Sequence, residues 1–319
     1  MNFVHADPEW FGLLRIVAEA VDRPVALVEK DYWVTHTLWA LHHQGFEVWF
    51  KGGTSLSKGF GLIERFSEDI DVRLDAGISG LQAPALSWKN SKAAAVAERD
   101  RWFDRIASEL EVDACEVKRD SLGSDARVLA ASFIVEYPAL HADQLPKPMR
   151  PFVLLEVGRA RVNPYVAADL SSWVHDHLEQ IEQIDDYIDN RPRSVRCIHP
   201  WVTCLEKIDA IAVRFDKGKE APDFARHYED AARILRSRDR LPELEGGLDG
   251  LVAELATDDK KRMPAPDHPS LLPTDSERWI EINEAWEAIK PLFWGSRISL
   301  NDACAEIREF VASLAGDPG

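Results

Sequence analysis

The sequence lacks the features of membrane, secreted and zinc-finger proteins. No apolar run approaches the ~18 residues that span a bilayer, and no basic stretch followed by an apolar one opens the chain. The four cysteines show no C-x-x-C pairing, which argues against a zinc site or a disulfide framework. These absences predict a soluble, cytoplasmic protein with no membrane partner.

Basic residues are also scarce. Lys and Arg together number 38 against 55 Asp and Glu, which gives a net charge of −17. Because phosphate contacts need clustered cations, this charge balance argues against a protein that binds nucleic acid over its whole surface. It does not exclude a local basic groove. Arginines gather within residues 159–161, 191–196 and 226–240. With 319 residues, 45% of them hydrophobic, the chain can form one large or two ordinary domains.

The most informative stretch is residues 50–74. A Gly52-Gly53 turn is followed by two acids in alternation, Asp69 and Asp71. Residues i and i+2 of a strand project from the same face, so both carboxylates can converge on one hard cation such as Mg²⁺. The glycines let backbone N–H groups approach a triphosphate closely. Together these parts predict a metal-dependent nucleotidyl-transfer site.

Each half of this motif also has a simpler interpretation. A Gly-Gly pair alone is more often only a turn, and an Asp-x-Asp at a strand edge is usually a solvated face. The flanking residues favour the functional interpretation. Val48, Trp49 and Phe50 predict an apolar strand that enters the turn, and Ile70 and Val72 alternate with the acids as in a half-buried strand.

A third acid occurs in another apolar segment. Residues 151–158 predict a strand whose one acid is Glu156. A lone acid in such a strand is costly to bury unless it is paired or binds a metal ion. Glu156 is therefore a candidate third carboxylate, and a position at the solvent edge of the strand is the alternative.

The remaining pattern predicts an α+β chain that becomes mainly helical after about residue 165. Thr203 and Glu206 have the spacing of a capping box and predict a helix start, and Asp223 predicts another. The other expected elements are helices at 8–44, 56–63, 92–109, 276–290 and 300–314, a loop at 75–92, and strands at 111–118 and 127–137.

Four blocks of residues occur in order along the chain. They are Glu29-Lys30-Asp31-Tyr32-Trp33, residues 50–71, Glu206-Lys207-Ile208-Asp209-Ala210 with Arg214, and Arg226-His227-Tyr228-Glu229-Asp230. These blocks resemble the motifs of the AbiEii/AbiGii toxin family of nucleotidyltransferases, within the DNA polymerase β-like superfamily, and Glu156 fits the second motif of that family. The gap between Gly53 and Asp69 is longer than in most polymerase-type transferases, and residues 240–319 match no motif.

The resemblance implies a fold and a set of site residues. It implies a nucleotidyltransferase-type mixed sheet with flanking helices in residues 1–165, and a helical domain in residues 166–319 that contributes Lys207 and Asp230 to the site. The implied metal ligands, for Mg²⁺ or Mn²⁺, are Asp69, Asp71 and Glu156, which with Lys207 and Asp230 make up the catalytic set. The implied nucleotide-binding residues are Lys51, Gly52, Gly53, Thr54, Ser55, Lys58, Arg65 and Ser67.

The leading hypothesis is therefore transfer of NMP from an NTP to a hydroxyl, on RNA and specifically tRNA. The resemblance also implies a toxin of a bacterial toxin–antitoxin or phage-defence system, with a cognate antitoxin encoded nearby. The motif specifies the triphosphate and metal but not the nucleophile, so a protein or small-molecule acceptor, or phosphoryl transfer, stays open. A non-catalytic binding module is a further alternative, although the intact acids argue against it.

Overall fold

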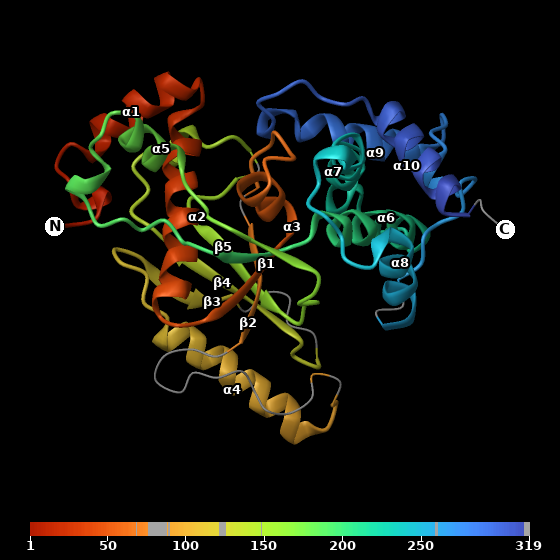
Figure 1. Cartoon of the computed structure of the whole chain (residues 1–319), viewed down its shortest axis with the longest axis horizontal. Helices are drawn as coiled ribbons and strands as arrows, with labels where there is room; N and C mark the ends of the chain where they lie inside the picture. Colours follow the sequence, from red (N-terminus) through yellow and green to blue (C-terminus); the bar gives the residue numbers. More distant parts are fainter. Residues whose placement is uncertain are drawn as a thin grey trace. The chain divides into compact units, whose positions relative to one another are not determined.

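The computed structural model describes residues 1–67, 69–75, 88, 90–120, 126–147, 149–258 and 261–315 (Figure 1). Glu68 and most of the predicted loop at 75–92 lie outside these residues. The chain forms two compact units. The first comprises Met1–Gly59 and Phe66–Cys197, and the second comprises Phe60–Arg65 and Ile198–Gly319.

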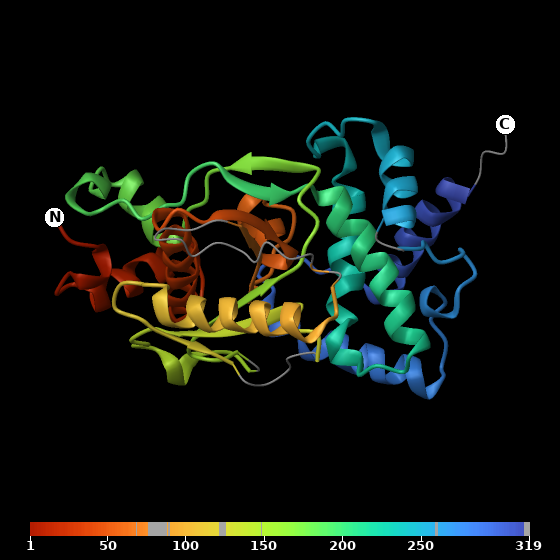
Figure 2. The same cartoon turned by 90° about the horizontal axis from the view of Figure 1, so that it is seen from below.

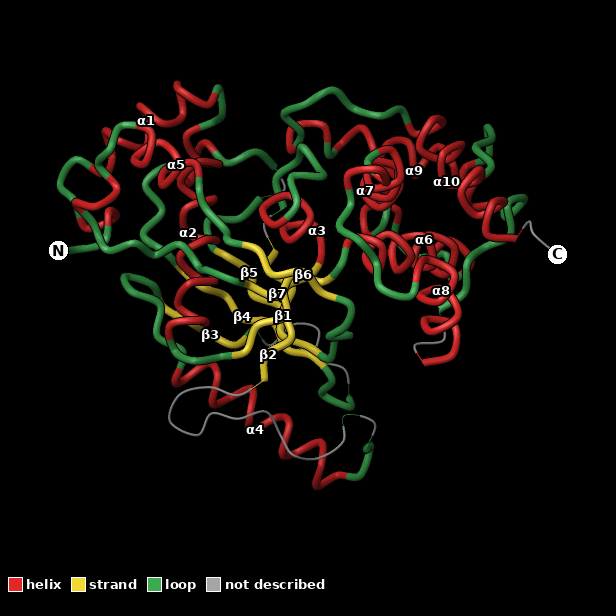
Figure 3. Tube along the Cα trace, in the orientation of Figure 1, coloured by secondary structure: helices red, strands yellow, loops and turns green. Residues whose placement is uncertain are grey.

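The first unit is built on a mixed sheet. Among the described residues, seven strands form it in the order β3-β4-β5-β2-β1-β7-β6 (Figure 3). Strand β2 is antiparallel to β1 and parallel to β5. The predicted α+β class, with a mixed sheet and flanking helices, is confirmed. The strands are β1 Glu47–Lys51, β2 Asp69–Asp75, β3 Glu116–Arg119, β4 Ala130–Glu136, β5 Val153–Gly158, β6 Tyr165–Ala168 and β7 Val195–Ile198.

Alternation along β2 separates an apolar face of the sheet from a polar one. Ile70, Val72 and Leu74 are buried, whereas Asp69, Asp71, Arg73 and Asp75 on the other face are half-buried. A strand with period-2 burial has one face against a core. On the apolar face, Phe103 packs against Phe133 of β4. Figure 2 shows α4, which carries Phe103, running along this sheet.

Helices flank the sheet within the first unit. The predicted helix at 8–44 is two helices, because Asp22 adopts a left-handed conformation (φ 52°) and Pro24 follows it. The predicted helix at 56–63 is instead a single turn of π-helix that spans Ser55–Gly59. The helices are α1 Trp10–Val21, α2 Val25–His43, α3 Gly52–Thr54, α4 Ala93–Glu109 and α5 Trp173–Gln180.

The second unit is helical. Helix α7 packs against both α6 and α10. The segment Phe60–Arg65 belongs to this unit, where Arg65 forms a β-bridge with Phe293 and the Trp294 amide donates to the Glu64 carbonyl at 3.1 Å. The helices are α6 Pro200–Asp216, α7 Ala225–Arg236, α8 Gly247–Asp258, α9 Glu277–Ala288 and α10 Leu300–Ala315.

Two predicted helix starts were wrong by a few residues. Helix α6 begins at Pro200, not at Thr203, because the His199 side chain accepts from the Trp201 amide and proline suits the first helical position. Helix α7 begins at Ala225, after a short 3₁₀ turn that contains Asp223. Within the described ranges, no helix has both the length and the apolar character needed to cross a bilayer.

Candidate active site

Three strands of the first unit bring a cation and two acids into one row. Lys51 on β1 is opposite Asp71 on β2, and Asp71 is opposite Glu156 on β5. Residues directly opposite one another on neighbouring strands project from the same face. The half-buried side of the sheet therefore carries a Lys51–Asp71–Glu156 row, which we call the acid row.

The Asp71 carboxylate lies against the backbone of Gly52. Gly52 has a φ of +78°, and a Cβ atom at this position would overlap the Asp71 carboxyl group. Only glycine meets both requirements without strain. The first glycine of the predicted motif is therefore necessary for the close approach of the turn to the acid.

The surroundings of Glu156 in this row shift its pKa. Burial, followed by the charges of Asp71 and Asp69 and a hydrogen bond with Asp71, raises the pKa of Glu156 to about 7, and Lys51 opposes this shift. Like charges in contact disfavour full ionisation. The alternative that Glu156 lies at the solvent edge does not fit this contact with Asp71.

The acid row has features of a binding site for a divalent cation. Within the described ranges, no three His, Cys, Asp or Glu side chains meet as a ready-made metal-binding group. Asp71 and Glu156 do converge, and Asp69 acts on Glu156 through its charge. Mg²⁺ is held in many enzymes by one or two carboxylates together with substrate phosphates. The residues thus fit a two-carboxylate site, with Asp69 as an additional nearby charge.

The turn after β1 is tied to the start of β2. The Thr54 hydroxyl donates to the carbonyls of Ser67 at 3.1 Å and Asp69 at 2.5 Å. The Ser55 hydroxyl is buried beside the Cys197 thiol. Gly53 is buried in the same turn. The Thr54 side chain therefore fixes the turn itself, and the backbone amides of the turn are the groups suited to phosphate.

Lys58 also has a partner inside the first unit. Its ammonium lies 2.5 Å from Asp31 of α2 and donates to the Ser171 carbonyl at 2.9 Å. Asp31 in turn accepts from the Trp173 amide. The geometry makes Lys58 a clamp that holds the turn to α2. The role of Asp31 was missed, although a charged triplet at 29–31 within an apolar helix was a signal for it.

In the second unit, one carboxylate receives two cations. Arg65 donates to both oxygens of Asp230, at 2.8 and 2.7 Å, and the Lys207 ammonium lies 2.8 Å from the same group. Burial favours the protonated form of Asp230, but the charges of Arg65 and Lys207 hold its pKa well below the usual range. Burial lowers the pKa of Lys207. This trio brings together three predicted site residues, all within the second unit.

A histidine that the sequence reasoning missed borders this trio. The ring nitrogens of His227 lie 3.4 Å from Lys207 and 3.1 Å from Arg214. Burial, then the charges of Lys207 and Arg226, lowers the pKa of His227 well below its usual value, so the ring is neutral. The spacing of His227 and Asp230, three residues apart on one helix face, was the available signal.

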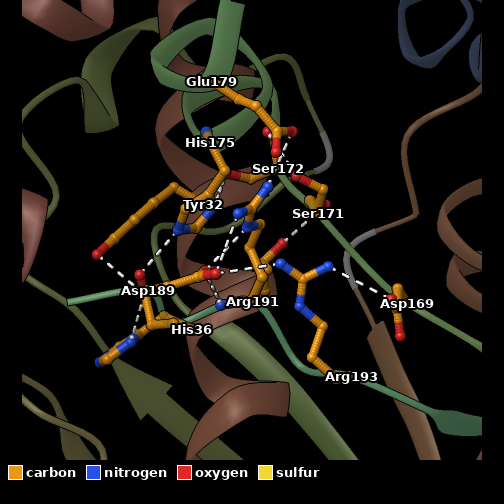
Figure 4. Close-up of polar contacts among 12 residues, drawn as sticks. Tyr32, His36, Asp169, Ser171, Ser172, His175, Glu179, Asp189, Arg191 and Arg193 are labelled. Carbon is orange, nitrogen blue, oxygen red and sulfur yellow. Dashed lines mark hydrogen bonds and ion pairs between the residues drawn. The ribbon is translucent and has the colours of Figure 1, made fainter. Parts of the chain in front are cut away.

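A buried polar network in the first unit positions strand β7 (Figure 4). His175 of α5 contacts Ser172 at 2.6 Å and the Asn190 amide oxygen at 2.7 Å. Asn190 donates onward to Tyr32 and lies 2.8 Å from His36, both on α2. Burial lowers the pKa of His36 to about 3 and that of His175 to about 4. The network ties the segment before β7 to the same helix that anchors Lys58.

The chain is similar to known nucleotidyltransferase toxins. A family model described as the nucleotidyl transferase AbiEii toxin of a type IV toxin–antitoxin system matches residues 38–297. No curated protein sequence matches the chain. The structure is similar to that of MenT4, a nucleotidyltransferase toxin from Mycobacterium tuberculosis H37Rv, with 15% identity, a TM-score of 0.40, and 95% of this chain and 98% of that chain covered. The family match includes the acid row and the Arg65–Lys207–Asp230 trio.

Proposed function

This chain belongs to the AbiEii nucleotidyltransferase toxin family, and from that premise we propose that it transfers NMP from an NTP to a hydroxyl of RNA, with tRNA as the substrate class and Mg²⁺ or Mn²⁺ as cofactor. The chain is a nucleotidyltransferase and a type IV toxin by family. The acceptor, the metal, a cytoplasmic location, a role in phage defence and a nearby antitoxin gene are part of the proposal.

The observation that carries the proposal is the contact between Asp71 and Glu156 above the Gly52 backbone. Burial, together with the charges of Asp71 and Asp69, raises the pKa of Glu156, so it costs free energy to keep both carboxylates of the row ionised. A divalent cation would offset this charge and the charge of the triphosphate when bound. Asp71 and Glu156 would hold it, with Asp69 beside them.

The chain's own groups have separate roles in this proposal. The backbone amides of Gly52 and Gly53 face the phosphates, and Lys51 is a cation within the same row. Thr54 and Lys58 keep the turn in place through the bonds already described. Ser55, Ser67 and Arg65 stay in the proposed nucleotide-binding set. Positioning and charge stabilisation of this kind supply most of the catalysis in such transfers.

The proposal also assigns Lys207 and Asp230 to the reaction. The ammonium of Lys207 would offset charge as the α-phosphate is attacked. Asp230 would orient that ammonium, since the two lie 2.8 Å apart. This assignment concerns residues of the second unit. It can therefore be wrong without affecting the roles assigned to the acid row.

Labelling with α- and γ-labelled NTPs tests the proposal. Purified protein is incubated with each NTP and total RNA, and we expect α-label to appear on RNA of tRNA size. Asp71→Asn should lower the labelling rate by about 100-fold or more, because the row loses a ligand and its charge. The matched control is Glu136→Gln, an exposed acid of the same sheet that pairs with Lys118 at 2.8 Å.

The possible results separate the alternatives. Alpha-label on the protein itself or on a small molecule would replace the RNA acceptor, and movement of γ-label would indicate phosphoryl transfer. Full activity of Asp71→Asn would contradict the assignment of the acid row. Loss of activity in Glu136→Gln would show that the assay responds to any acid removed from this sheet.

A further inference from the structure

A second row lies on the polar face of the sheet beside the acid row. Arg73 of β2 is opposite Trp49 of β1, and Trp49 is opposite Arg196 of β7. Trp49 precedes Lys51 by two residues, and Arg73 follows Asp71 by two. Two residues along a strand span about 7 Å and return to the same face. The Arg73–Trp49–Arg196 row therefore runs parallel to the acid row and next to it.

The side chains of this second row are stacked. The guanidinium of Arg196 lies 4.8 Å from the Trp49 ring centre, and that of Arg73 lies 5.6 Å from it. Arg196 is also 5.8 Å from the ring of Tyr165, on the neighbouring strand β6. The Tyr165 side chain is 43% exposed. A supported guanidinium beside an exposed aromatic ring forms a surface on which a planar group can stack.

The indole of Trp49 supports the row from within. Trp49 is only 8% exposed, and the guanidinium groups of Arg196 and Arg73 lie over its ring. The Trp49 ring is therefore covered, and it holds Arg196 beside the exposed ring of Tyr165.

Both arginines of this row are paired with acids. Arg73 pairs with Asp75 at 2.8 Å, and Arg196 is 3.4 Å from Glu47. Arg73 also donates to the Ala160 carbonyl, which follows the end of β5. Next to Ala160 in the chain is Arg159, whose side chain is exposed. Arg159 is thus an exposed cation close in sequence to a backbone group that Arg73 binds.

We propose that Tyr165 and Arg196, supported by Trp49 and Arg73, form a stacking surface that binds an unpaired nucleotide of the acceptor RNA beside the acid row. This inference rests on the proposed RNA acceptor. Proteins recognise single-stranded RNA by stacking bases on aromatic rings and on guanidinium planes, with basic groups along the phosphates. A base stacks on Tyr165 and Arg196, Arg159 meets a phosphate, and the buried Trp49 ring holds Arg196 in place.

The surface also explains why an acidic protein can accept an anionic polymer. Binding is local, because the stacking groups lie in this row and Arg159 follows the adjoining end of β5. A nucleotide held there is about two strand residues away from the carboxylates of the acid row. The surface selects an unpaired strand, because the bases of a duplex do not offer an open face for stacking.

Binding of a fluorescein-labelled single-stranded oligoribonucleotide, followed by fluorescence anisotropy without NTP, tests the surface directly. Tyr165→Ala should weaken binding about tenfold, the loss of one base–aromatic stack, while Tyr165→Phe should bind as the wild type does. Arg159→Ala should reduce the slope of log affinity against log salt by about 0.7, the value for one phosphate contact. Phe11→Ala is the matched control, since Phe11 is a similarly exposed aromatic on α1, at 49%.

Steady-state labelling of total tRNA gives the second readout. Tyr165→Ala should raise KM for tRNA about tenfold and leave KM for NTP unchanged. Equal affinity and equal KM in Tyr165→Ala and Phe11→Ala would overturn the surface, while intact labelling of tRNA would still support the proposed function. Weaker oligoribonucleotide binding by Tyr165→Ala in a protein that labels no RNA would support the surface and contradict the proposed acceptor. Loss of label from a protein acceptor in Tyr165→Ala, with unchanged RNA binding, would overturn the RNA assignment.

Discussion

The two carboxylate clusters of this chain have opposite electrostatics. In the first unit, Asp71 is in contact with another acid, Glu156, whose pKa rises to about 7 because of burial and the neighbouring acids. In the second unit, Asp230 is bound by Arg65 and Lys207, and its pKa falls far below the usual range. Both clusters were assigned to one chemistry from the sequence, yet only the acid row has a surplus of negative charge, whereas two cations share the one carboxylate of Asp230.

This electrostatic difference distinguishes a cluster that can bind a cation from one that holds its own side chains in place. A carboxylate that already receives a bidentate guanidinium and an ammonium has little to gain from another cation. Two acids that repel each other gain from one. The acid row is therefore the region suited to a divalent cation, and Asp230 is suited to holding Lys207 and Arg65 in fixed places.

The largest expected effect tests that role of Asp230. Asp230→Asn should lower the free energy of unfolding by about 3–5 kcal/mol, because the buried Arg65 and Lys207 would lose a counter-charge that both of them bind. Urea unfolding followed by circular dichroism measures the change. Asp239→Asn, an exposed acid just after the same helix, is the control and should differ little from the wild type. Equal stability of the two variants would show that Asp230 is not the counter-charge of the cluster.

The next largest expected effect is on stability at acid pH, and it comes from the buried network of His175, Ser172 and Asn190 in the first unit (Figure 4). Burial lowers the pKa of His175 to about 4 from 6.5, so the unfolded chain binds its proton first as pH falls. Stability from this group is complete above pH 6.5 and is lost progressively down to pH 4, by about 3 kcal/mol at the lower end. His175→Gln should remove the part of the acid sensitivity that comes from this group, measured as Tm against pH, while His36, whose pKa burial lowers to about 3, keeps its own part.

His177→Gln supplies the control for that measurement. His177 is on the same helix, two residues further along, and is half-buried. The variant should keep the pH dependence of the wild type. If His175→Gln and His177→Gln give parallel Tm profiles between pH 4 and 6.5, the network of His175 with Ser172 and Asn190 is not the acid-sensitive element.

The contents of the acid row could be predicted from the sequence, but its arrangement could not. Alternation of acids with Ile70 and Val72 indicated a half-buried strand, and a lone acid in an apolar segment indicated Glu156. The pairing of Asp71 with Glu156 depends on β2 lying parallel to β5, a long-range choice of strand order. No local pattern specifies such a register.

The ion-pair partners of buried charged residues could not be predicted from the sequence either. Lys58 suits phosphate by its place after the glycines, yet it is paired with Asp31 and is 27 residues away from it in the chain. Arg65 suited phosphate for the same reason, and the structure pairs it with Asp230. The start of α6 was readable, since His199 and Pro200 form a cap and a first turn, but the Thr203 pattern was chosen instead.

The smallest expected effect is an increase in stability, and it tests most directly the electrostatic difference between the acid row and the Asp230 cluster. The folded pKa of Glu156 is raised from 4.5 to about 7, so its favourable contribution is complete below pH 4.5 and is lost as pH rises through 7. Glu156→Gln should remove the repulsion with Asp71. After allowance for partial solvent screening, we expect a gain of about 1–2 kcal/mol at pH 8 in EDTA.

This gain should depend on the metal. Added Mg²⁺ should stabilise the wild type by binding only the folded state and should stabilise Glu156→Gln less, because one ligand is gone. Glu136→Gln, in the same sheet, should follow the wild type in both buffers. The protein would then become more stable when the acid row loses Glu156 and less stable when the other cluster loses Asp230. A Glu156→Gln protein that is destabilised at pH 8 in EDTA would mean that Glu156 is already compensated within the fold, and the acid row would lose its distinction from the Asp230 cluster.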